Sequence, residues 1–476
     1  MAAPFLSASD RKALLDQTLE LLLDYYEHTQ KYRVTPILDK VAIRDSVRVF
    51  DFQKKLDPIK SINQVINSLS QYSVHTPHPK YFGLFNPRSN FPSILSDLIT
   101  AVFNPQLAAW SHSPFANEVE RYLIQAFGEK FGFDPAKIDG VFAGGGAEAN
   151  QTATLCALNH LVPDYGSNGL FGLGKRPLVY CSAESHHSIH KAAMTSGLGH
   201  GAVRIIPVTD RLEMDPVLLK HQLERDFADG QQPLMVVATA GTTGVGAIDD
   251  LTAIGNIAKQ FGLWFHVDAA YGGAAVLHTE LKTYLPGISE ADSITFDAHK
   301  WLSVTMGTSL FICSHSDILA KTFRISADYM PKEAKDMGIV DPFTHSIQWS
   351  RRALGVKLYL SLLMFGWKGY EDIIGHQTAM GHSLRRELEA SGWSIENTSP
   401  FPVVCFTDPI HAMEPAFVPT IIQNVLGSGK SWISSYPIHG IPVFRACVTN
   451  FDTEEHHVKE LVEELNDARD EYKKIR

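Results

Sequence analysis

The chain has 476 residues, 45% of them hydrophobic, so it can bury a large core and is expected to form two or three lobes. Its net charge of -10 comes from interspersed acidic and basic residues, which argues against nucleic acid and membrane surfaces as partners. No apolar run approaches the roughly 20 residues that cross a bilayer. The five cysteines are widely spaced and form no C-x-x-C pair. A reducing, cytoplasmic location without disulfides is therefore expected.

The first part of the chain shows helical periodicity. Apolar residues recur at helical spacing over residues 9–30 and 61–72, and the second stretch leads into a proline-bearing segment at 76–79. We therefore predict a helical N-terminal segment over residues 1–85.

Short apolar runs alternate with helical patterns between about residues 90 and 311. This alternation predicts an α/β domain over residues 86–349, with a mainly parallel sheet and helices on both faces. The apolar runs are 140–143, 178–180, 203–206, 234–237, 264–267 and 293–296.

The pattern changes after residue 349. Two long helices are predicted over about 351–365 and 370–390, followed by short strands at 402–406 and 443–448 and a charged helix from Thr453. We therefore predict a C-terminal α+β lobe over residues 350–476.

Residues with useful chemistry follow two of the predicted strands. In open α/β sheets, ligands bind at the carboxyl ends of the strands. The run 264–267 leads to Asp268, and the run 293–296 leads to Asp297 and then Lys300. A carboxylate such as Asp268 can keep a pyridinium nitrogen protonated, and a desolvated lysine amine can form a Schiff base.

A glycine-rich turn follows the run 140–143. Glycines 144–146 open into a helical pattern, and the exposed N–H groups of such a turn and helix start suit a phosphate. The same stretch also fits the dinucleotide fingerprint G-x-G-x-x-A, so a nicotinamide-dependent oxidoreductase is an alternative. Asp164 lies about 20 positions further on, but in a loop-like run instead of at the end of a second strand.

Six motifs in order resemble the group II pyridoxal-phosphate (PLP) dependent decarboxylases, the fold-type I family that contains aromatic L-amino acid, histidine and glutamate decarboxylases. The resemblance extends from about Leu69 to the C-terminus. It implies a seven-stranded, mainly parallel sheet and PLP as the cofactor. The motifs are residues 78–82, 145–150, 183–188, 239–244, 266–271 and 297–301.

The resemblance also implies roles for individual residues. Lys300 would carry PLP as a Schiff base, Asp268 would pair with the pyridine nitrogen, and His186 would stack on the ring face that the substrate approaches. Ala270 would pack on the opposite face and Thr242 beside the phenolic oxygen. The phosphate would be held by backbone groups of Ala147, Glu148 and Ala149, by Asn150 and by His299.

The same resemblance bears on the reaction, which the fold alone does not define. Tyr329 lies where the family has a mobile catalytic loop whose tyrosine protonates the carbanion left by loss of carbon dioxide. Related enzymes that consume oxygen and release an aldehyde commonly have phenylalanine there or lack the stacking histidine. Tyr329 and His186 therefore favour decarboxylation of an L-amino acid, with oxidative deamination or another carbon–carbon lyase reaction as alternatives. The family's loop reaches the other subunit, which implies a homodimer with a shared active site.

The pocket wall suggests the type of substrate. Phe85, Asn86, Arg88 and Gln106 lie where aromatic decarboxylases of the family have bulkier, more apolar residues at several places. We therefore expect a substrate with a polar or anionic side chain, and Arg88 is a candidate carboxylate fork.

A metal site is the remaining possibility. His186 and His190 are one helical turn apart, a spacing that can bind zinc. The sequence has no H-E-x-x-H motif, so we predict no catalytic metal.

Overall fold

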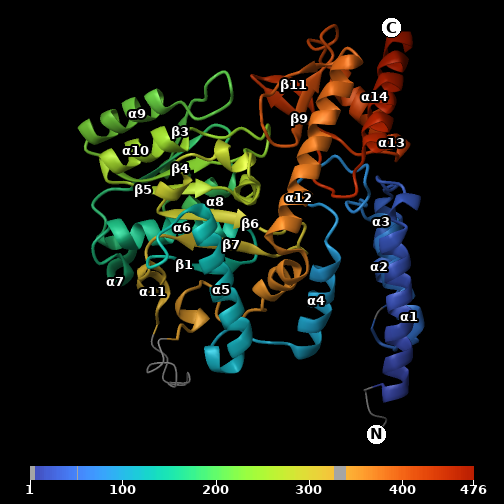
Figure 1. The fold of residues 1–476 in the computed structure, drawn as a ribbon, viewed down its shortest axis with the longest axis horizontal. Helices are drawn as coiled ribbons and strands as arrows, with labels where there is room; N and C mark the ends of the chain where they lie inside the picture. Colours follow the sequence, from blue (N-terminus) through green and yellow to red (C-terminus); the bar gives the residue numbers. More distant parts are fainter. Residues whose placement is uncertain (1–5, 51, 326–338, 476) are drawn as a thin grey trace.

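The computed structural model describes residues 6–50, 52–325 and 339–475, and it is built around two β-sheets (Figure 1). The larger sheet has seven strands in the order β1-β7-β6-β5-β4-β2-β3. Neighbouring strands from β6 through β3 are parallel, whereas β7 runs antiparallel to both β6 and β1. The strands are β1 (Asp139–Ala143), β2 (Pro177–Ser182), β3 (Val203–Ile206), β4 (Gln232–Thr239), β5 (Trp264–Asp268), β6 (Ser293–Asp297) and β7 (Ser309–Cys313).

The mainly parallel α/β sheet is thus confirmed, and the six predicted apolar runs form six of its strands. The seventh strand, β7, was not among those runs. Both faces are buried, as the alternation along β4 shows. Val236 and Ala238 face one apolar core, and Met235 and Val237 face the other. Because both sets are hydrophobic, the strand appears in the sequence as a continuous apolar run.

Helices line the two cores. One core contains side chains of α5 (Pro114–Phe131), α9 (Pro216–Ala228) and α10 (Leu251–Phe261). The other contains side chains of α6 (Gly146–Leu161), α8 (Ser188–Thr195) and α11 (Ile318–Phe323). The short helix α7 (Tyr165–Asn168) follows α6. Helices therefore cover both faces of the sheet, as predicted.

The C-terminal part forms a second α/β unit. Its antiparallel sheet has the order β10-β11-β9-β8. The predicted pair of long helices corresponds to α12, which consists of two helical parts joined at Gly366. The φ of 62° and ψ of -179° at Gly366 are not helical. The elements are α12 (Gly355–Ala390), β8 (Ser394–Ile395), β9 (Val403–Thr407), α13 (Phe417–Ser428), β10 (Ser434–Ile438), β11 (Ile441–Cys447) and α14 (Glu455–Ile475).

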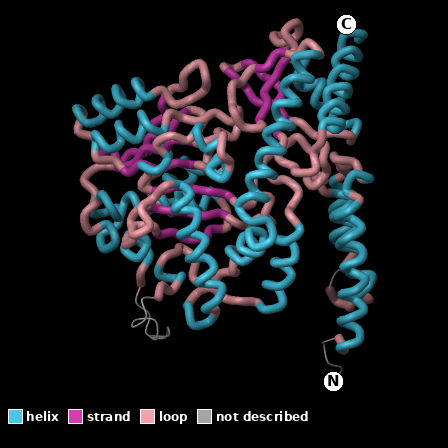
Figure 2. Tube along the Cα trace, viewed as in Figure 1, coloured by secondary structure: helices cyan, strands magenta, loops and turns pink. Residues whose placement is uncertain are grey.

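The N-terminal helices form an arm beside the main body (Figure 2). The arm consists of α1 (Ala8–Glu27), α2 (Lys40–Arg48) and α3 (Pro58–Tyr72), and these three helices contain no buried residue over their described lengths. The sequence pattern indicated α1 and α3 but not α2. The next helix, α4 (Phe91–Phe103), packs against α12 in the main body.

The cysteines, membrane-spanning helices and domain boundaries were also subjects of prediction from the sequence. The five cysteines, all among the described residues, are buried and unpaired, as expected. In the described part of the chain, no helix is long and apolar enough to span a bilayer. The domain boundaries after residues 85 and 349 stay predictions.

Candidate active site

The carboxyl ends of the parallel strands bring the candidate catalytic residues to one edge of the large sheet. Asp268 is the last residue of β5 and Asp297 the last of the neighbouring β6, and Lys300 follows one turn later. The glycine turn leaves the end of β1 and leads into α6. His186 lies within electrostatic range of Asp268, Lys300 and Asp297. The structure therefore brings Asp268, Lys300 and His186 together at one edge of the sheet.

The amine of Lys300 faces a buried carboxylate. Its Nζ lies 3.1 Å from Oδ2 of Asp297, and the Lys300 side chain is 23% exposed. The hydroxyl of Ser309 donates to the other oxygen of Asp297. Asp297 was not among the predicted site residues, although its place at a strand end three residues before Lys300 was a usable signal. The lysine is thus held at the sheet edge while it stays accessible.

Asp268 is a buried carboxylate that accepts hydrogen bonds from two donors. Its Oδ2 accepts a hydrogen bond from Nδ2 of Asn150 at 2.9 Å, and its Oδ1 accepts the N–H of Ala270 at 3.2 Å. Charge-assisted hydrogen bonds favour the ionised form of a buried acid. A carboxylate oxygen accepts more than one hydrogen bond, so Asp268 retains capacity for a further donor such as a protonated ring nitrogen.

Asn150 does not have the predicted role at the phosphate. Its Nδ2 donates to Asp268 and to Oγ of Ser188, at 2.9 and 2.8 Å. Its Oδ1 accepts from Oγ1 of Thr295 at 2.7 Å and lies 3.0 Å from Nε2 of His266. All donor and acceptor positions of the amide are therefore used inside the protein. The side chain turns toward the sheet, where it cannot also bind a phosphate.

His186 is held by the start of α8. Its Nδ1 lies 2.8 Å from Oγ of Ser188, and the N–H of Ser188 donates to the same nitrogen at 3.2 Å. Burial lowers the pKa of His186, although the charge of Asp268 opposes this effect. The imidazole is therefore neutral at neutral pH, which suits stacking on a flat ring.

The glycine turn has the form of an anion cradle. A Cβ atom at Gly145 would meet nothing within 4 Å, so open space lies beside the turn. A Cβ atom at Gly146 would lie 2.9 Å from Oδ2 of Asp297, which excludes larger residues there. The N–H groups of Glu148 and Ala149 already donate to the carbonyl of Gly145, at 3.0 and 3.2 Å. These two N–H groups are therefore not the free donors that we predicted.

Ala147 keeps its predicted place in the first turn of α6, where N–H groups lack partners within the helix. The side chain of Glu148 instead accepts from the N–H of Gly144 and the amide of Gln348, at 2.8 and 2.7 Å. His299 is 7% exposed, and its Nδ1 lies 3.0 Å from the carbonyl oxygen of Thr308. Burial lowers the pKa of His299, so it adds a polar neutral ring next to Lys300.

Thr242 and Ala270 are buried near this edge, as the resemblance implied. The Oγ1 of Thr242 accepts the N–H of Ala247 at 3.0 Å, which leaves its hydroxyl proton for another acceptor. Ala270 is 8% exposed, and its small side chain follows directly after Asp268 and Ala269.

An aromatic column borders the lysine. Phe85 stacks on Tyr271 with ring centroids 3.8 Å apart, and Tyr271 stacks on Trp301 at 4.9 Å. The amine of Lys300 lies 5.8 Å from the centroid of Phe85. Asn86 accepts the hydroxyl of Tyr81 at 3.0 Å. Phe85 therefore lies near the amine of Lys300, and its role in the pocket wall stays a prediction.

Arg88 and Gln106 are engaged elsewhere. Nη1 of Arg88 pairs with Asp452 at 2.6 Å, Nη2 donates to the carbonyl of Tyr26 at 2.7 Å, and the guanidinium lies 3.9 Å from the Tyr26 ring centroid. Arg88 thus links the N-terminal arm to the C-terminal lobe. Because both of its terminal nitrogens are engaged there, the prediction that Arg88 binds a substrate carboxylate does not fit this structure. Gln106 is exposed and donates to the hydroxyl of Ser350 at 2.9 Å.

Arg445 on β11 is a candidate site residue that the sequence did not indicate. Its Nε donates to the carbonyl of Gly244 at 2.9 Å and its Nη1 to that of Gly83 at 2.8 Å. Its Nη2 is buried without a hydrogen-bond partner, and the guanidinium lies 5.1 Å from the ring of Phe85. A buried cationic donor without a partner is costly, so it marks a place for an anionic group. Tyr329 lies outside the described residues.

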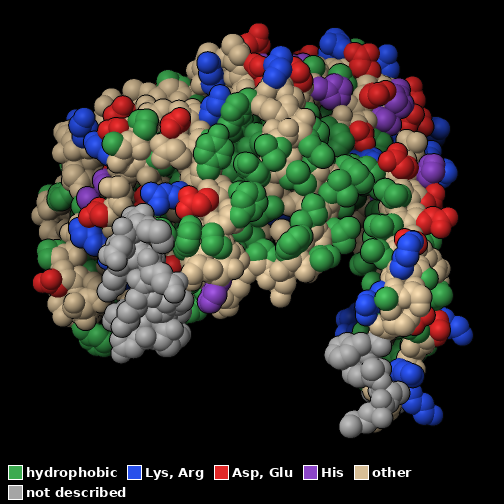
Figure 3. All heavy atoms as spheres, turned by 60° about the horizontal axis from the view of Figure 1, so that its bottom comes forward, with side chains coloured by type: hydrophobic (Ala, Val, Ile, Leu, Met, Phe, Trp, Pro, Cys, Tyr) green, Lys and Arg blue, Asp and Glu red, His purple; other side chains and the backbone are tan. Residues whose placement is uncertain are grey.

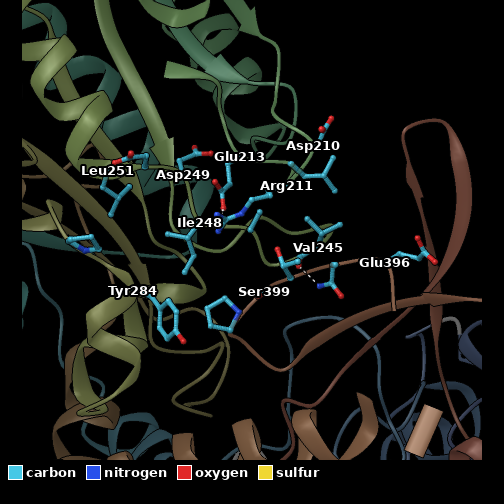
Figure 4. Close-up of a pocket in the computed structure, with 17 residues that line it drawn as sticks. Asp210, Arg211, Glu213, Val245, Ile248, Asp249, Leu251, Tyr284, Glu396 and Ser399 are labelled. Carbon is cyan, nitrogen blue, oxygen red and sulfur yellow. Dashed lines mark hydrogen bonds and ion pairs between the residues drawn. The ribbon is translucent and has the colours of Figure 1, made fainter. Parts of the chain in front are cut away.

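A separate cavity of about 370 Å³ lies where the large domain meets the C-terminal lobe (Figure 4). Arg211 pairs there with Glu213 at 2.9 Å, and burial raises the pKa of Asp249 to about 7. Asp249 accepts the N–H groups of Met214 and Thr239, at 2.6 and 2.7 Å. The described residues that line this cavity include no predicted site residue.

The residues at the sheet edge fit PLP. The accessible amine of Lys300 matches the aldehyde, and the buried carboxylate of Asp268 matches the ring nitrogen. The neutral imidazole of His186 matches the ring face. The glycine turn, with open space before a helix, matches the phosphate. A family model described as the pyridoxal-dependent decarboxylase conserved domain matches residues 46–408. The chain belongs to this family.

Relatives of this decarboxylase-family protein span several activities. It is 26% identical to an aromatic-L-amino-acid decarboxylase of Bacillus atrophaeus, over 94% of this chain and 92% of the relative. It is 28% identical to an L-aspartate decarboxylase of Metarhizium robertsii, over 84% and 79%. It is 27% identical to a phenylacetaldehyde synthase of a Rosa hybrid cultivar, over 93% and 90%.

The solved structures agree with this assignment. A crystal structure of mouse CSAD is 26% identical and superposes with a TM-score of 0.91, covering 97% of this chain and 99% of the mouse chain. The protein is therefore a PLP-dependent enzyme of the amino acid decarboxylase, or carboxy-lyase, class.

The buried network predicts how acid affects stability. His266 is fully buried, and burial lowers its pKa to about 4, below the usual value of 6.5. The unfolded state therefore binds the proton first as pH falls through 6.5, and folding stability is lost down to the folded pKa. From about pH 7 to about pH 5, His266 should account for up to about 2 kcal/mol of lost stability.

Urea unfolding at both pH values measures this loss. His266→Gln should reduce the acid-induced loss, and His221→Gln at an exposed position of α9 should not. Equal pH slopes for the wild type and His266→Gln would contradict the assignment.

Proposed function

We propose that this protein decarboxylates an L-amino acid with a polar or anionic side chain, releasing an amine and carbon dioxide. The observation that carries the proposal is the gathering of Lys300, Asp268 and His186 at one sheet edge, next to the unpartnered Nη2 of Arg445. The amine, carboxylate and imidazole suit PLP, and the guanidinium suits a carboxylate of the substrate.

Each residue has a distinct task in this proposal. Bound PLP supplies an electron sink for the charge left at Cα when a bond to it breaks. Lys300 holds the cofactor covalently through its amine. Asp268 keeps a proton on the ring nitrogen, and His186 covers the ring face on the substrate side. Tyr329 delivers a proton to Cα once carbon dioxide has left.

The preference for an acidic side chain rests on Arg445. Its Nη2 is a buried cationic donor beside Phe85, whereas Nη1 and Nη2 of Arg88 are occupied by Asp452 and Tyr26 and only its Nε is unpartnered. The aspartate decarboxylase relative supports an acidic substrate, and the Bacillus relative supports an aromatic one. Aromatic side chains would leave the Arg445 nitrogen without a partner, which favours the acidic class.

Aldehyde formation is the second candidate, because a phenylacetaldehyde synthase is among the relatives. The two reactions differ in their products. Decarboxylation yields carbon dioxide and an amine, whereas the oxygen-dependent reaction consumes oxygen and water and yields carbon dioxide, ammonia, peroxide and an aldehyde in place of the amine.

The purified holoenzyme should release carbon dioxide and amine in equal amounts from an acidic L-amino acid, with ammonia and peroxide near background. Measurement of all four products over acidic, aromatic and basic amino acids tests this expectation. Ammonia and peroxide in step with carbon dioxide would identify the aldehyde-forming reaction instead.

Lys300→Ala provides the control for this panel. The variant should lose turnover and the ability to retain cofactor after borohydride reduction, which converts a lysine-linked cofactor into a stable secondary amine. Lys321→Ala, on an exposed face of α11, should keep both properties.

Substitution of Arg445 should change substrate selection. Arg445→Lys keeps a positive charge but loses the planar fork, so kcat/KM for acidic amino acids should fall at least about tenfold relative to that for neutral ones. Arg88→Ala should leave this ratio unchanged, because its guanidinium is bound by Asp452 and Tyr26.

An unchanged ratio in an Arg445→Lys variant that still binds PLP would exclude the proposed carboxylate contact. If that variant does not fold, the wild-type enzyme still provides the test. Dicarboxylates should then compete with substrate more strongly than monocarboxylates of the same length.

We also propose a homodimer with a shared active site. Hydrophobic side chains gather on the face between the main body and the N-terminal arm (Figure 3). On α4, Val102 and Phe103 are 77% and 80% exposed, and on α12 Leu363 is 63% exposed. An exposed apolar face of this kind favours association, and a second copy is the partner that the family resemblance implies.

Val102→Asp combined with Phe103→Asp should convert the holoenzyme from dimer to monomer in sedimentation equilibrium. A charged group in an apolar interface opposes association, since burial of the unpaired charge is costly. Ile410→Asp is the matched control, because Ile410 is 77% exposed on the C-terminal lobe. A wild-type enzyme with the mass of one chain would refute the dimer.

A further inference from the structure

Asn150 lies at the centre of a buried chain of hydrogen bonds that ends at Asp268. Nε1 of Trp264 donates to Oγ of Ser293 at 2.8 Å, and that hydroxyl lies 2.8 Å from Nδ1 of His266. Nε2 of His266 lies 3.0 Å from Oδ1 of Asn150, whose Nδ2 donates to Asp268 at 2.9 Å. The exposed fraction is at most 4% for each of these residues.

The donors in this chain all point the same way. The amide oxygen of Asn150 can only accept, so Nε2 of His266 carries the proton of the neutral imidazole and donates to it. Nδ1 of His266 is then an acceptor, and the Ser293 hydroxyl, which itself accepts the indole N–H of Trp264, donates to Nδ1. Each bond polarises the next, so the amide of Asn150 becomes a stronger donor to Asp268.

A second branch leads from Asn150 to His186. Nδ2 of Asn150 donates to Oγ of Ser188 at 2.8 Å, so the Ser188 hydroxyl donates onward to Nδ1 of His186, also 2.8 Å away. The N–H of Ser188 points to the same Nδ1 at 3.2 Å. Two donors at Nδ1 place the proton of His186 on Nε2.

We propose that Asn150 is a positioning residue that couples both protein contacts to the PLP ring. Through one N–H it keeps Asp268 ionised and oriented toward the ring nitrogen. Through the other N–H and Ser188 it sets the tautomer and orientation of His186. The inference rests on the proposed roles of Asp268 and His186. It differs from a phosphate-binding role, because the amide has no free donor for a phosphate.

Asn150→Asp is the sharpest probe of this coupling. The substitution replaces the donor to Asp268 with a second carboxylate and gives Ser188 a stronger acceptor than His186. A less anionic Asp268 holds the ring-nitrogen proton more weakly. Loss of that positive charge lets the Lys300-linked nitrogen of the bound cofactor, whose protonation sets the visible absorbance, keep its own proton to higher pH. The midpoint of the pH titration of this absorbance should therefore rise by at least about one pH unit, without substrate present.

Cofactor affinity separates positioning from phosphate binding. If Asn150 positions Asp268, Asn150→Asp should weaken the binding of PLP and of phosphate-free pyridoxal by similar factors. For PLP, the dissociation constant should rise at least about tenfold. A loss confined to PLP would identify Asn150 as a phosphate ligand and overturn the proposal. A wild-type titration midpoint in Asn150→Asp would overturn it as well.

Asn159→Asp is the matched control on the same helix. Nδ2 of Asn159 donates only to the carbonyl of Leu155 at 3.0 Å among its described hydrogen bonds, so neither the midpoint nor the affinity should change. Ser188→Ala should keep the titration midpoint near that of the wild type but lower kcat, since it breaks only the branch to His186. A full-size midpoint shift in either variant would contradict the coupling through Asn150.

Asp268→Asn distinguishes failure of this inference from failure of the proposed function. If Asp268→Asn itself leaves the titration unchanged, the role of Asp268 is wrong. If it shifts the midpoint and Asn150→Asp does not, only the coupling is wrong. Where Asn150→Asp does not fold, Thr295→Val removes one donor to Asn150 and should give a smaller shift of the same sign. An unchanged midpoint in Thr295→Val would then refute the chain.

Discussion

The candidate site depends on keeping the carboxylate of Asp268 charged inside the protein. A buried ionised acid is unfavourable unless hydrogen bonds replace the water that it loses. The amide of Asn150 and the N–H of Ala270 supply these bonds. His266 and Thr295 in turn hold the amide of Asn150, so one charge organises polar groups from α6, β5 and β6. The seven-stranded sheet makes this possible, because its parallel strands end at the same edge.

The contact that we propose for the substrate lies at the junction between the two sheets. Arg445 comes from β11 of the C-terminal lobe, yet its Nε and Nη1 hold the carbonyls of Gly244 and Gly83. The same side chain lies over Phe85, which stacks on Tyr271 of the large domain. In the proposed function, chemistry and substrate selection are supplied by different parts of the chain. This division is consistent with relatives that act on aromatic or acidic substrates within one fold.

The errors in the sequence-based expectations concern where side chains point. Asn150 lies one turn after the start of α6, so its position alone is compatible with the phosphate or with the sheet. Hydrogen bonds from Thr295 and His266 turn the Asn150 side chain toward the sheet, and both residues lie on strands more than a hundred residues away in sequence. Arg88 follows the predicted pocket segment directly, but its long side chain reaches Asp452 and Tyr26. Arg445 has no local signal, since its surroundings come from two distant segments, one at Gly83 and Phe85 and one at Gly244.

The sequence by itself determined the α/β sheet, the helices on both of its faces and the presence of an amine, a carboxylate and a glycine turn at the strand ends. These features depend on local periodicity and on the rule that parallel strands end at one edge, and both can be recognised in a single chain. Only the tertiary structure decided the partners of Asn150, the engagement of Arg88 and the burial of Nη2 of Arg445 without a partner. Hydrogen bonds act over about 3 Å and require direction, so they depend on segments that meet only after the chain has folded.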